Sequence, residues 1–359
     1  MNAPFRPVLL AAPRCRVADP GDPREAAGIE RYLAGTRQAT VFHSPRWLTA
    51  VAAGTGNRAL ALIAERAGDV CGYLPLVEAH SPVFGRVLAS SGFGVGGGIL
   101  ADDDDSASEL AAAAEELALR GSIGAIELRG GQLPAGRAGW TVSTASHAGF
   151  AWDLAPDDEA QLLAIPRKQR AEVRKGLAND LTVEVGTARA DRDAHYAVYA
   201  QSVRNLGTPV FPRALFEAVL DMLDAEILTV RAAGVPVASV LSLYHRGSVI
   251  PYWGGGIPAA RALRANDRMY FELMRHARAR GCTRFDFGRS KTASGPYNFK
   301  RNWGFEPEPL AYAAWAPPGA PVRDANPLSP RLARQVALWQ KLPLGVANRI
   351  GPWIARGLA

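Results

Sequence analysis

Cysteine is scarce in this sequence, and its placement argues against any cysteine-based site. Only three of the 359 residues are cysteine, at positions 15, 71 and 282, and none of them belongs to a CxxC pair or has a histidine close by. An odd, scattered set excludes a disulfide scaffold and does not provide the ligand spacing of a zinc site. We therefore expect no metal centre and a reduced, cytoplasmic environment.

Long apolar runs are missing too. The first residues, MNAPFRPVLLAAPRC, do not contain the apolar core of about 7 to 15 residues that defines a signal peptide. No run of about 18 apolar residues, the length a helix needs to cross a bilayer, occurs in the chain. The expectation is a cytoplasmic protein with neither a signal peptide nor a membrane span.

Familiar catalytic motifs are also absent. The six histidines are isolated, none lies in an HExxH motif, and the GxSxG turn of hydrolases does not occur. The acidic run from Asp102 to Asp105 lacks the spacing of a calcium loop and predicts a solvated loop at a helix N-terminus. Glycine-rich runs at 95–100 and 253–258 fit neither a P-loop nor a GxGxxG turn.

The chain does have the composition of a globular protein with an excess of arginine. It is 48% hydrophobic and 21% charged, and its length fits about two domains. Lys and Arg number 41 against 34 Asp and Glu, which gives a net charge of +7, and only five of the 41 are lysine. This charge either keeps the protein soluble or attracts anionic ligands, depending on where it clusters.

The most informative pattern is an internal repeat. Three segments recur in the same order at offsets of 160 to 167 residues: 44–51 with 211–219, 62–76 with 228–243, and 116–130 with 276–290. The first pair predicts a helix that begins at a proline, the second a β-hairpin, and the third a helix closed by glycine before a strand. We therefore expect an α+β module built twice.

The second copy can be followed further. Its apolar run at 238–256 predicts two strands, and Asn266 or Asp267 is expected to cap the helix that follows. Apolar residues recur on one face of that helix and predict a core contact rather than a ligand site.

A basic strip lies between the two copies, at 165–180. It includes Arg170, Arg174 and Lys175 and only two acidic residues. Such a strip is either a solvated helix face or a contact for phosphate, because Arg and Lys form charge-assisted hydrogen bonds to phosphate.

The segment 285–307 combines a strand end, flexible residues, aromatics and cations. Asp286 lies on the predicted strand, and Arg289 and Ser290 follow at its end, where loops commonly carry function. Lys300 and Arg301 lie between aromatic residues that would strengthen their electrostatic effect. The alternative is that these aromatics, which include Tyr297, Phe299 and Trp303, only anchor a loop.

Three motifs resemble the FemAB-type, GNAT-like transferases, in particular the FemAB-like proteins associated with exosortase/PEP-CTERM exopolysaccharide loci. The motifs are RNLGTPVFP (204–212), RGCTRFDFGRS (280–290) and GPYNFKRNWG (295–304), and the similarity runs from about residue 40 onward. The resemblance implies two GNAT-like modules in tandem. It also implies transfer of an amino acid from aminoacyl-tRNA to an amine of a peptidoglycan precursor.

In that family's F-K-x-x-[FW]-G segment the lysine falls on Lys300, where the resemblance implies that it stabilises the oxyanion at the attacked carbonyl. The chain lacks the coiled-coil insertion of some members and also a clean pyrophosphate loop at 260–269. The donor therefore stays open between acyl-CoA and aminoacyl-tRNA. The expected modules are 1–155 and 156–316, the second of which carries the main site.

Together these readings give a set of candidate residues. Lys300 is the catalytic candidate. The candidates for substrate contact are Asp286, Arg289, Ser290, Tyr297, Asn298, Phe299, Trp303, Tyr252 and Thr208. The candidates for phosphate or donor contact are Arg170, Arg174, Lys175 and Arg301.

The C-terminal tail, 317–359, is basic and amphipathic. It contains Arg331, Arg334, Lys341, Arg349 and Arg356, with no acidic residue after Asp324, and two Trp among its apolar residues. Such a segment either lies on the anionic inner membrane or docks as a helix on the first module.

The leading hypothesis is a transferase that moves an acyl or aminoacyl group to an amine of a cell-envelope or exopolysaccharide precursor. A non-catalytic protein that binds such a precursor or an assembly partner is the alternative. A nucleic-acid-binding module ranks last, because no stacking aromatics interleave with the cations at 167–175.

Overall fold

The computed structural model describes residues 12–81, 85–320 and 333–358. In the first half of the chain the helices are α1 (Pro23–Gly35), α2 (Pro45–Thr55) and α3 (Asp104–Arg120), with a short 3-10 helix η1 (Val41–His43). The strands are β1 (Arg14–Ala18), β2 (Arg58–Arg66), β3 (Asp69–Ser81), β4 (Gly85–Ser90), β5 (Leu100–Ala101), β6 (Ile126–Arg129) and β7 (Trp140–Asp153).

The second half repeats this order with added helices. Its strands are β8 (Thr182–Gly186), β9 (Ala225–Ala232), β10 (Val235–His245), β11 (Ser248–Gly256), β12 (Arg284–Lys291) and β13 (Glu308–Trp315). Its helices are α4 (Asp158–Ala164), α5 (Arg167–Ala178), α6 (Arg189–Asn205), α7 (Arg213–Met222), α8 (Pro258–Ala262), α9 (Ala265–Ala279) and α10 (Gly295–Asn302). Two further helices end the chain, α11 (Ala333–Lys341) and α12 (Leu344–Ala355).

The predicted repeat is confirmed. Helices α2 and α7, hairpins β2–β3 and β9–β10, helices α3 and α9, and strands β6 and β12 occupy corresponding places in the two halves. Gly68 and Gly234 adopt φ of 93° and 80° in the two hairpin turns, a conformation that costs glycine little. Asp103 caps α3 by accepting a hydrogen bond from Ser106 N, so the acidic run marks a helix N-terminus as predicted.

One predicted cap is wrong. Helix α9 begins at Ala265 after Arg264, which has a left-handed backbone and makes no side-chain cap. Asp267 instead accepts a hydrogen bond from Gln169 Nε2 of α5 at 2.5 Å. The tertiary contact between α5 and α9 therefore replaces the local cap.

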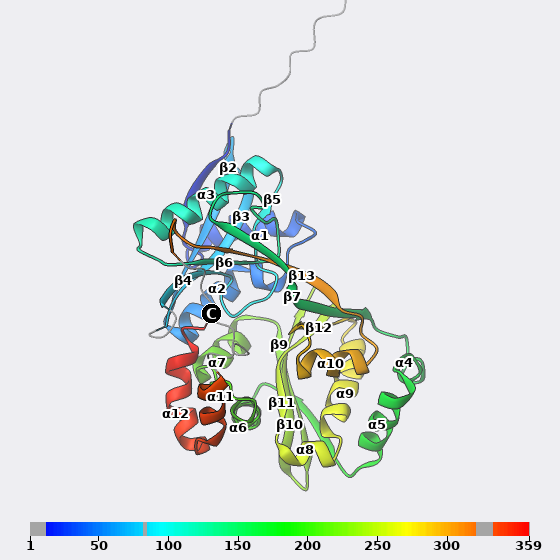
Figure 1. The fold of residues 1–359 in the computed structure, drawn as a ribbon. Helices are drawn as coiled ribbons and strands as arrows, with labels where there is room; N and C mark the ends of the chain where they lie inside the picture. The colour runs from blue at the N-terminus through cyan, green and yellow to red at the C-terminus, as the bar shows by residue number, and fades with distance from the viewer. Residues whose placement is uncertain (1–11, 82–84, 321–332, 359) are drawn as a thin grey trace, which may run out of the picture.

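A single sheet joins the two halves of the protein (Figure 1). Its order is β1-β2-β3-β4-β6-β13-β7-β12-β11-β10-β9-β8, and β5 pairs with β3. Strand β13, although last in sequence, lies between β6 and β7, and β7 continues to β12. Strand β13 of the second half thus pairs with two strands of the first half, and β7 of the first half pairs with two strands of the second.

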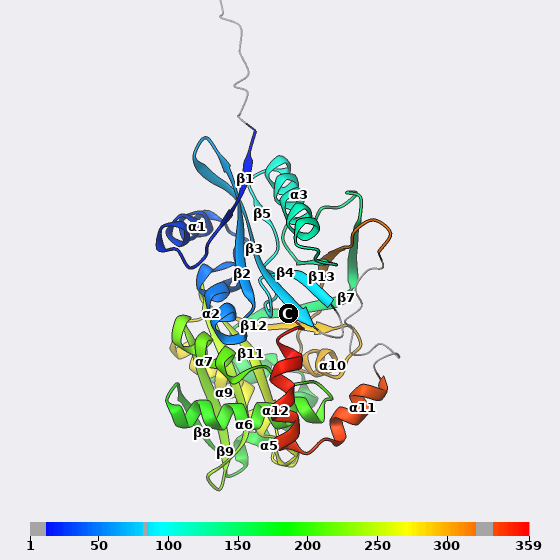
Figure 2. The same ribbon diagram turned by 90° about the vertical axis from the view of Figure 1, so that its left-hand side faces the viewer.

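Helices α2 and α7 pack directly against each other where the halves meet (Figure 2). A Cβ on Gly54 would lie 2.3 Å from Leu215 Cα, so only glycine permits this approach. Buried side chains from both halves form one core cluster here, and Trp47 donates a hydrogen bond to Ser91 O at 2.7 Å.

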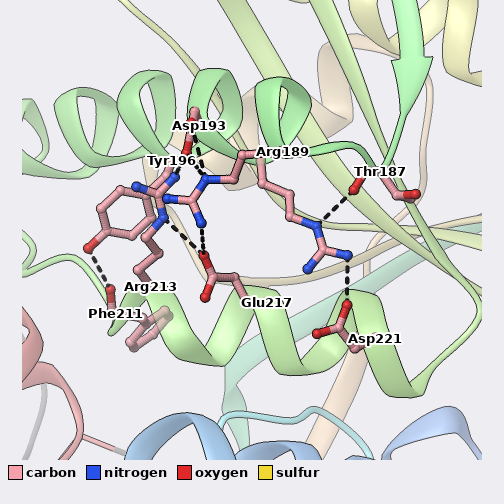
Figure 3. A network of polar contacts seen from close by, with 9 residues as sticks. Thr187, Arg189, Asp193, Tyr196, Phe211, Arg213, Glu217 and Asp221 are labelled. Carbon is pink, nitrogen blue, oxygen red and sulfur yellow. Dashed lines mark hydrogen bonds and ion pairs between the residues drawn. The ribbon is translucent and has the colours of Figure 1, made fainter.

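A polar network ties α6 to α7 on the outer side (Figure 3). Arg213 contacts both Asp193 and Glu217, and Tyr196 donates a hydrogen bond to Phe211 O at 3.1 Å. Because α7 also packs on α2, this network fixes α6 relative to the junction of the two halves.

The C-terminal helices α11 and α12 pack on α6, which belongs to the second half. One alternative from the sequence places the tail on the first half. The chain end does reach the first half, where Asn57 Nδ2 donates a hydrogen bond to Arg356 O at 2.8 Å. Arg331 of the predicted basic tail lies outside the described residues. Among the helices described, none is long and apolar enough to cross a membrane.

Candidate active site

The candidate site centres on α10, a short helix that follows strand β12. Ser294 caps it by accepting a hydrogen bond from Tyr297 N at 3.3 Å, and Pro296 occupies its first turn, where a missing N–H costs nothing. The helix packs on β12 and turns Lys300 inward. The local sequence thus places one lysine against the end of a central strand.

Lys300 is held by backbone carbonyls and aromatic rings. Its side chain is only 8% exposed, and Nζ donates hydrogen bonds to Gly288 O at 3.2 Å and Arg289 O at 2.9 Å. The ring centroids of Phe150 and Phe287 lie 5.3 and 5.2 Å from Nζ, within cation–π range. An ammonium has three N–H donors, so these carbonyls leave one donor for a ligand.

Burial perturbs this lysine strongly. It lowers the pKa of Lys300 from 10.5 to about 7, with Arg289 adding to the effect and Asp286 opposing it. Burial also raises the pKa of Asp286, whose carboxylate accepts a hydrogen bond from Gly288 N at 2.9 Å. A pair of groups with shifted pKa values at a strand end is typical of an active site.

An irregularity in β12 exposes the two carbonyls that Lys300 contacts. The pairing of β12 with β7 shifts register between Asp286 and Arg289, and Gly288 has φ of 66°. On its other side, β12 pairs with β11 only at Arg284 and Phe285. Beyond that point the carbonyls of β12 are available to Lys300.

Arg289 lies in a cluster that the sequence did not predict. Its Nη1 donates a hydrogen bond to Tyr312 Oη at 3.1 Å, and the His147 ring lies 5.0 Å from that of Tyr312. Burial lowers the pKa of His147 to about 4, with Arg289 as the next cause. Arg129 interacts electrostatically with Arg289, and it is buried.

A sequence signal for Arg129 did exist. Gly121 and Gly281 correspond in the repeat at an offset of 160, and the same offset takes Arg129 to Arg289. Both arginines already lie inside the third pair of repeated segments, 116–130 and 276–290, so carrying the candidate Arg289 over to the first copy would have marked Arg129. Tyr312 and His147 carry no such signal, since they lie on β13 and β7.

The other candidates on β12 and α10 surround Lys300 at different depths. Ser290 is buried, and its hydroxyl has no hydrogen-bond partner within the described residues. Asn298 and Arg301 are exposed on α10, whereas Tyr297 and Phe299 are half-buried. Trp303 is fully buried in the core of the second half, where it supports α10 rather than presenting a surface.

Two candidates lie at the junction of the halves. Tyr252 donates a hydrogen bond to Phe93 O, and its ring lies 5.0 Å from that of Phe42. Thr208 follows Gly207, which lies close to Val336 of α11, and precedes Val210, which lies close to Gly351 of α12. Its loop therefore underlies the C-terminal helices.

The basic strip forms α5, whose outer face is exposed. Lys175 is paired with Glu172 at 2.7 Å, and Arg174 is exposed while Arg170 is half-buried. The start of α5 approaches the end of α10, because a Cβ on Gly304 would lie 3.0 Å from Pro166 Cδ. The strip therefore begins beside α10 but runs away from it along α9.

Two surface hollows lie away from Lys300. One is formed by α1 and the β2–β3 hairpin, and the other by β8, β9 and α9. Neither is lined by any of the candidate residues.

Comparison with known proteins identifies the class of domain. Residues 167–301 match the sequence profile of the acetyltransferase (GNAT) domain. This segment runs from the start of α5 to Arg301 of α10, so the likeness covers the part of the second half that contains Lys300. No curated protein matches the sequence.

Solved structures extend the likeness to most of the chain. FemX is similar with a TM-score of 0.61 at 14% identity, over 80% of this chain and 95% of FemX. A tandem GNAT protein from the clavulanic acid biosynthesis pathway gives 0.56 at 13%, over 86% and 99% of the two chains. L-PGS from Bacillus licheniformis gives 0.50 at 14%, over 91% and 99%. The predicted fold, two GNAT-type modules in tandem, is thereby confirmed.

Proposed function

We propose that this protein is a transferase that moves an acyl or aminoacyl group to an amine, with Lys300 as the catalytic residue. The observation that carries the proposal is the buried ammonium of Lys300, fixed by two carbonyls with one N–H left over. A donor preorganised in this way can stabilise negative charge that develops on a carbonyl oxygen. The GNAT match over residues 167–301 supports the same class of reaction.

In the proposed reaction the neutral amine of the acceptor attacks the carbonyl carbon of the donor. A new C–N bond forms, and the C–S bond of a thioester or the C–O bond of an ester breaks. The third N–H of Lys300 donates to the oxyanion while the tetrahedral intermediate exists. The leaving sulfur or oxygen departs with the proton that the attacking nitrogen gives up, so atoms and charge balance.

Lys300 can act only while it is protonated. With a pKa of about 7, the lysine loses its charge as the pH rises past neutrality. A neutral amine held by the same carbonyls would have a lone pair where the third N–H was, and it would then act as a base. The oxyanion role therefore predicts that kcat/KM has a limb that falls above about pH 7.

The donor is acyl-CoA or aminoacyl-tRNA, and the acceptor is an amine of a cell-envelope or exopolysaccharide precursor. The acetyltransferase match favours the first donor, while the motifs shared with FemAB-type proteins favour the second and suggest the acceptor. We assign substrate contacts to the side chains that surround Lys300 and are not fully buried, in particular Arg289, Tyr297 and Asn298.

A paired binding titration separates the donors. The purified protein is titrated with acetyl-CoA and with charged tRNA, each at low and at moderate salt. Saturable binding of acetyl-CoA that tolerates salt identifies an acyl-CoA enzyme, whereas tRNA binding should weaken steeply with salt. If the protein binds neither acetyl-CoA nor charged tRNA, the proposal is overturned in favour of a non-catalytic precursor-binding protein.

A further inference from the structure

Helix α12 turns its small residues toward the protein. Ala347, Gly351 and Ala355, four residues apart, form its buried face. A Cβ on Gly351 would lie 3.1 Å from Val210 N, so the helix axis is close to the segment that follows α6. The packing of this helix therefore depends on small side chains.

Three large apolar residues of the same helix face outward, while Leu344 and Ile354 are half-buried. Val346, Ile350 and Trp353 are 46%, 39% and 54% exposed. Their spacing of four and three residues aligns them along one side of the helix. In an ordinary surface helix this apolar stripe would be the buried one, so its orientation is the reverse of what protein packing alone requires.

Helix α11 adds to the same surface. Leu338 is 66% exposed, while Val336 approaches Gly207 and holds the helix on the protein. Both helices lie over α6 (Figures 1 and 2). Together they carry four of the eleven large hydrophobic residues that are exposed in the described chain. Single exposed residues are ordinary, but this concentration indicates an interaction surface.

The charge of this surface has one sign. Arg334, Lys341, Arg349 and Arg356 are exposed, and the sequence contains no acidic residue after Asp324. Within the described residues none of these four cations forms an ion pair. Exposed arginines elsewhere on the molecule do form ion pairs, as Arg120 does with Glu116 on α3.

We propose that α11 and α12 form a docking surface for an anionic phospholipid membrane. Exposed aliphatic side chains and an indole suit the boundary between headgroups and acyl chains, and flanking cations suit lipid phosphates. A protein partner would have to be acidic and apolar at once, whereas an anionic bilayer offers both properties over any area. The inference rests on this surface alone and is independent of the proposed transfer reaction.

The test is co-sedimentation of the full chain with lipid vesicles. Vesicles of phosphatidylcholine are compared with vesicles that contain about 30% phosphatidylglycerol, at low and at high salt. Binding is expected only to the anionic vesicles and should weaken as salt screens the charges. The substitutions R349Q and R356Q each remove one cation, and each should weaken binding to the anionic vesicles about fivefold. I350S with W353S should weaken it comparably.

Matched substitutions on α3 provide the control. Leu119 is 56% exposed and Arg120 is exposed beside it, so L119S with R120Q removes the same kinds of group from another surface. This control variant should bind like the wild type, and circular dichroism should show that all variants remain folded. Equal binding to both vesicle types, or equal losses in the α3 and α12 variants, would overturn the proposal. So would a tail-dependent dimer that does not bind vesicles.

Discussion

The burial of Lys300 makes a prediction about stability that does not require knowledge of the substrate. The folded protein holds this lysine with a pKa of about 7, against 10.5 for an ordinary lysine. Between these values the unfolded chain carries a proton that the folded chain has released, so the free energy of unfolding rises with pH in this window. Below about pH 7 Lys300 is protonated in the folded protein too, so the full cost of burying its ammonium lowers the free energy of unfolding.

The magnitude follows from the linkage. Each pH unit in which one proton is released on folding changes the free energy of unfolding by about 1.4 kcal/mol. Between about pH 6 and pH 9 roughly two such units apply to Lys300, which gives about 3 kcal/mol. Lys300→Met keeps the length of the side chain but cannot titrate, so it lacks this contribution.

The assay is urea unfolding of the wild type and Lys300→Met, followed by far-ultraviolet circular dichroism at both pH values. The wild type should gain about 3 kcal/mol relative to Lys300→Met on going from about pH 6 to pH 9. Taking the difference between the proteins removes the contributions of titrating groups that do not interact with Lys300. A pH-independent difference between the two proteins would refute the buried, shifted lysine. Lys341→Met, on exposed α11, is the control and should show no such change.

Further predictions concern the backbone, the module junction, acid stability and the pH profile. Gly288→Ala should lower the free energy of unfolding by about 1 kcal/mol in urea unfolding, because a residue with a Cβ is strained at this positive φ. The same substitution should also lower the turnover rate of the folded protein, because it moves the carbonyl that Lys300 contacts. Gly54→Ala should destabilise the α2–α7 contact by about 1–3 kcal/mol in urea unfolding, since its Cβ would meet the backbone of Leu215. Burial lowers the pKa of His195 to about 3, so stability should fall as the pH drops below about 6.5, and less steeply in His195→Gln. The falling limb of kcat/KM near pH 7 should disappear in Lys300→Arg if that variant is active, and a limb that rises through pH 7 in the wild type would indicate a base instead.

The architecture could be predicted because its signals are local. Prolines at helix starts and glycines in hairpin turns recur at a nearly constant offset, and each of them specifies its own turn or helix end. Lys300 could be singled out for the same reason, since the loop and helix around it are contiguous in sequence. Each of these features is specified by residues that are close to it in the sequence.

The rest of the site depends on strand pairing across the two halves. Phe150 lies on β7, which reaches the site by pairing with β12, and Tyr312 lies on β13, which reaches it by pairing with β7. No periodicity in the sequence encodes these pairings. The failed cap of α9 has a similar cause, because Gln169 binds the Asp267 carboxylate that would have capped the helix.

The measurement that tests the account most directly is amide formation by the wild type and by Lys300→Met. Each purified protein is incubated with the donor that it binds and an amine acceptor, and product is quantified by mass spectrometry. We expect kcat to fall by about 100- to 1,000-fold in Lys300→Met, the loss typical of one oxyanion donor, with donor binding retained. A folded Lys300→Met protein that transfers at the wild-type rate would contradict the central role of Lys300.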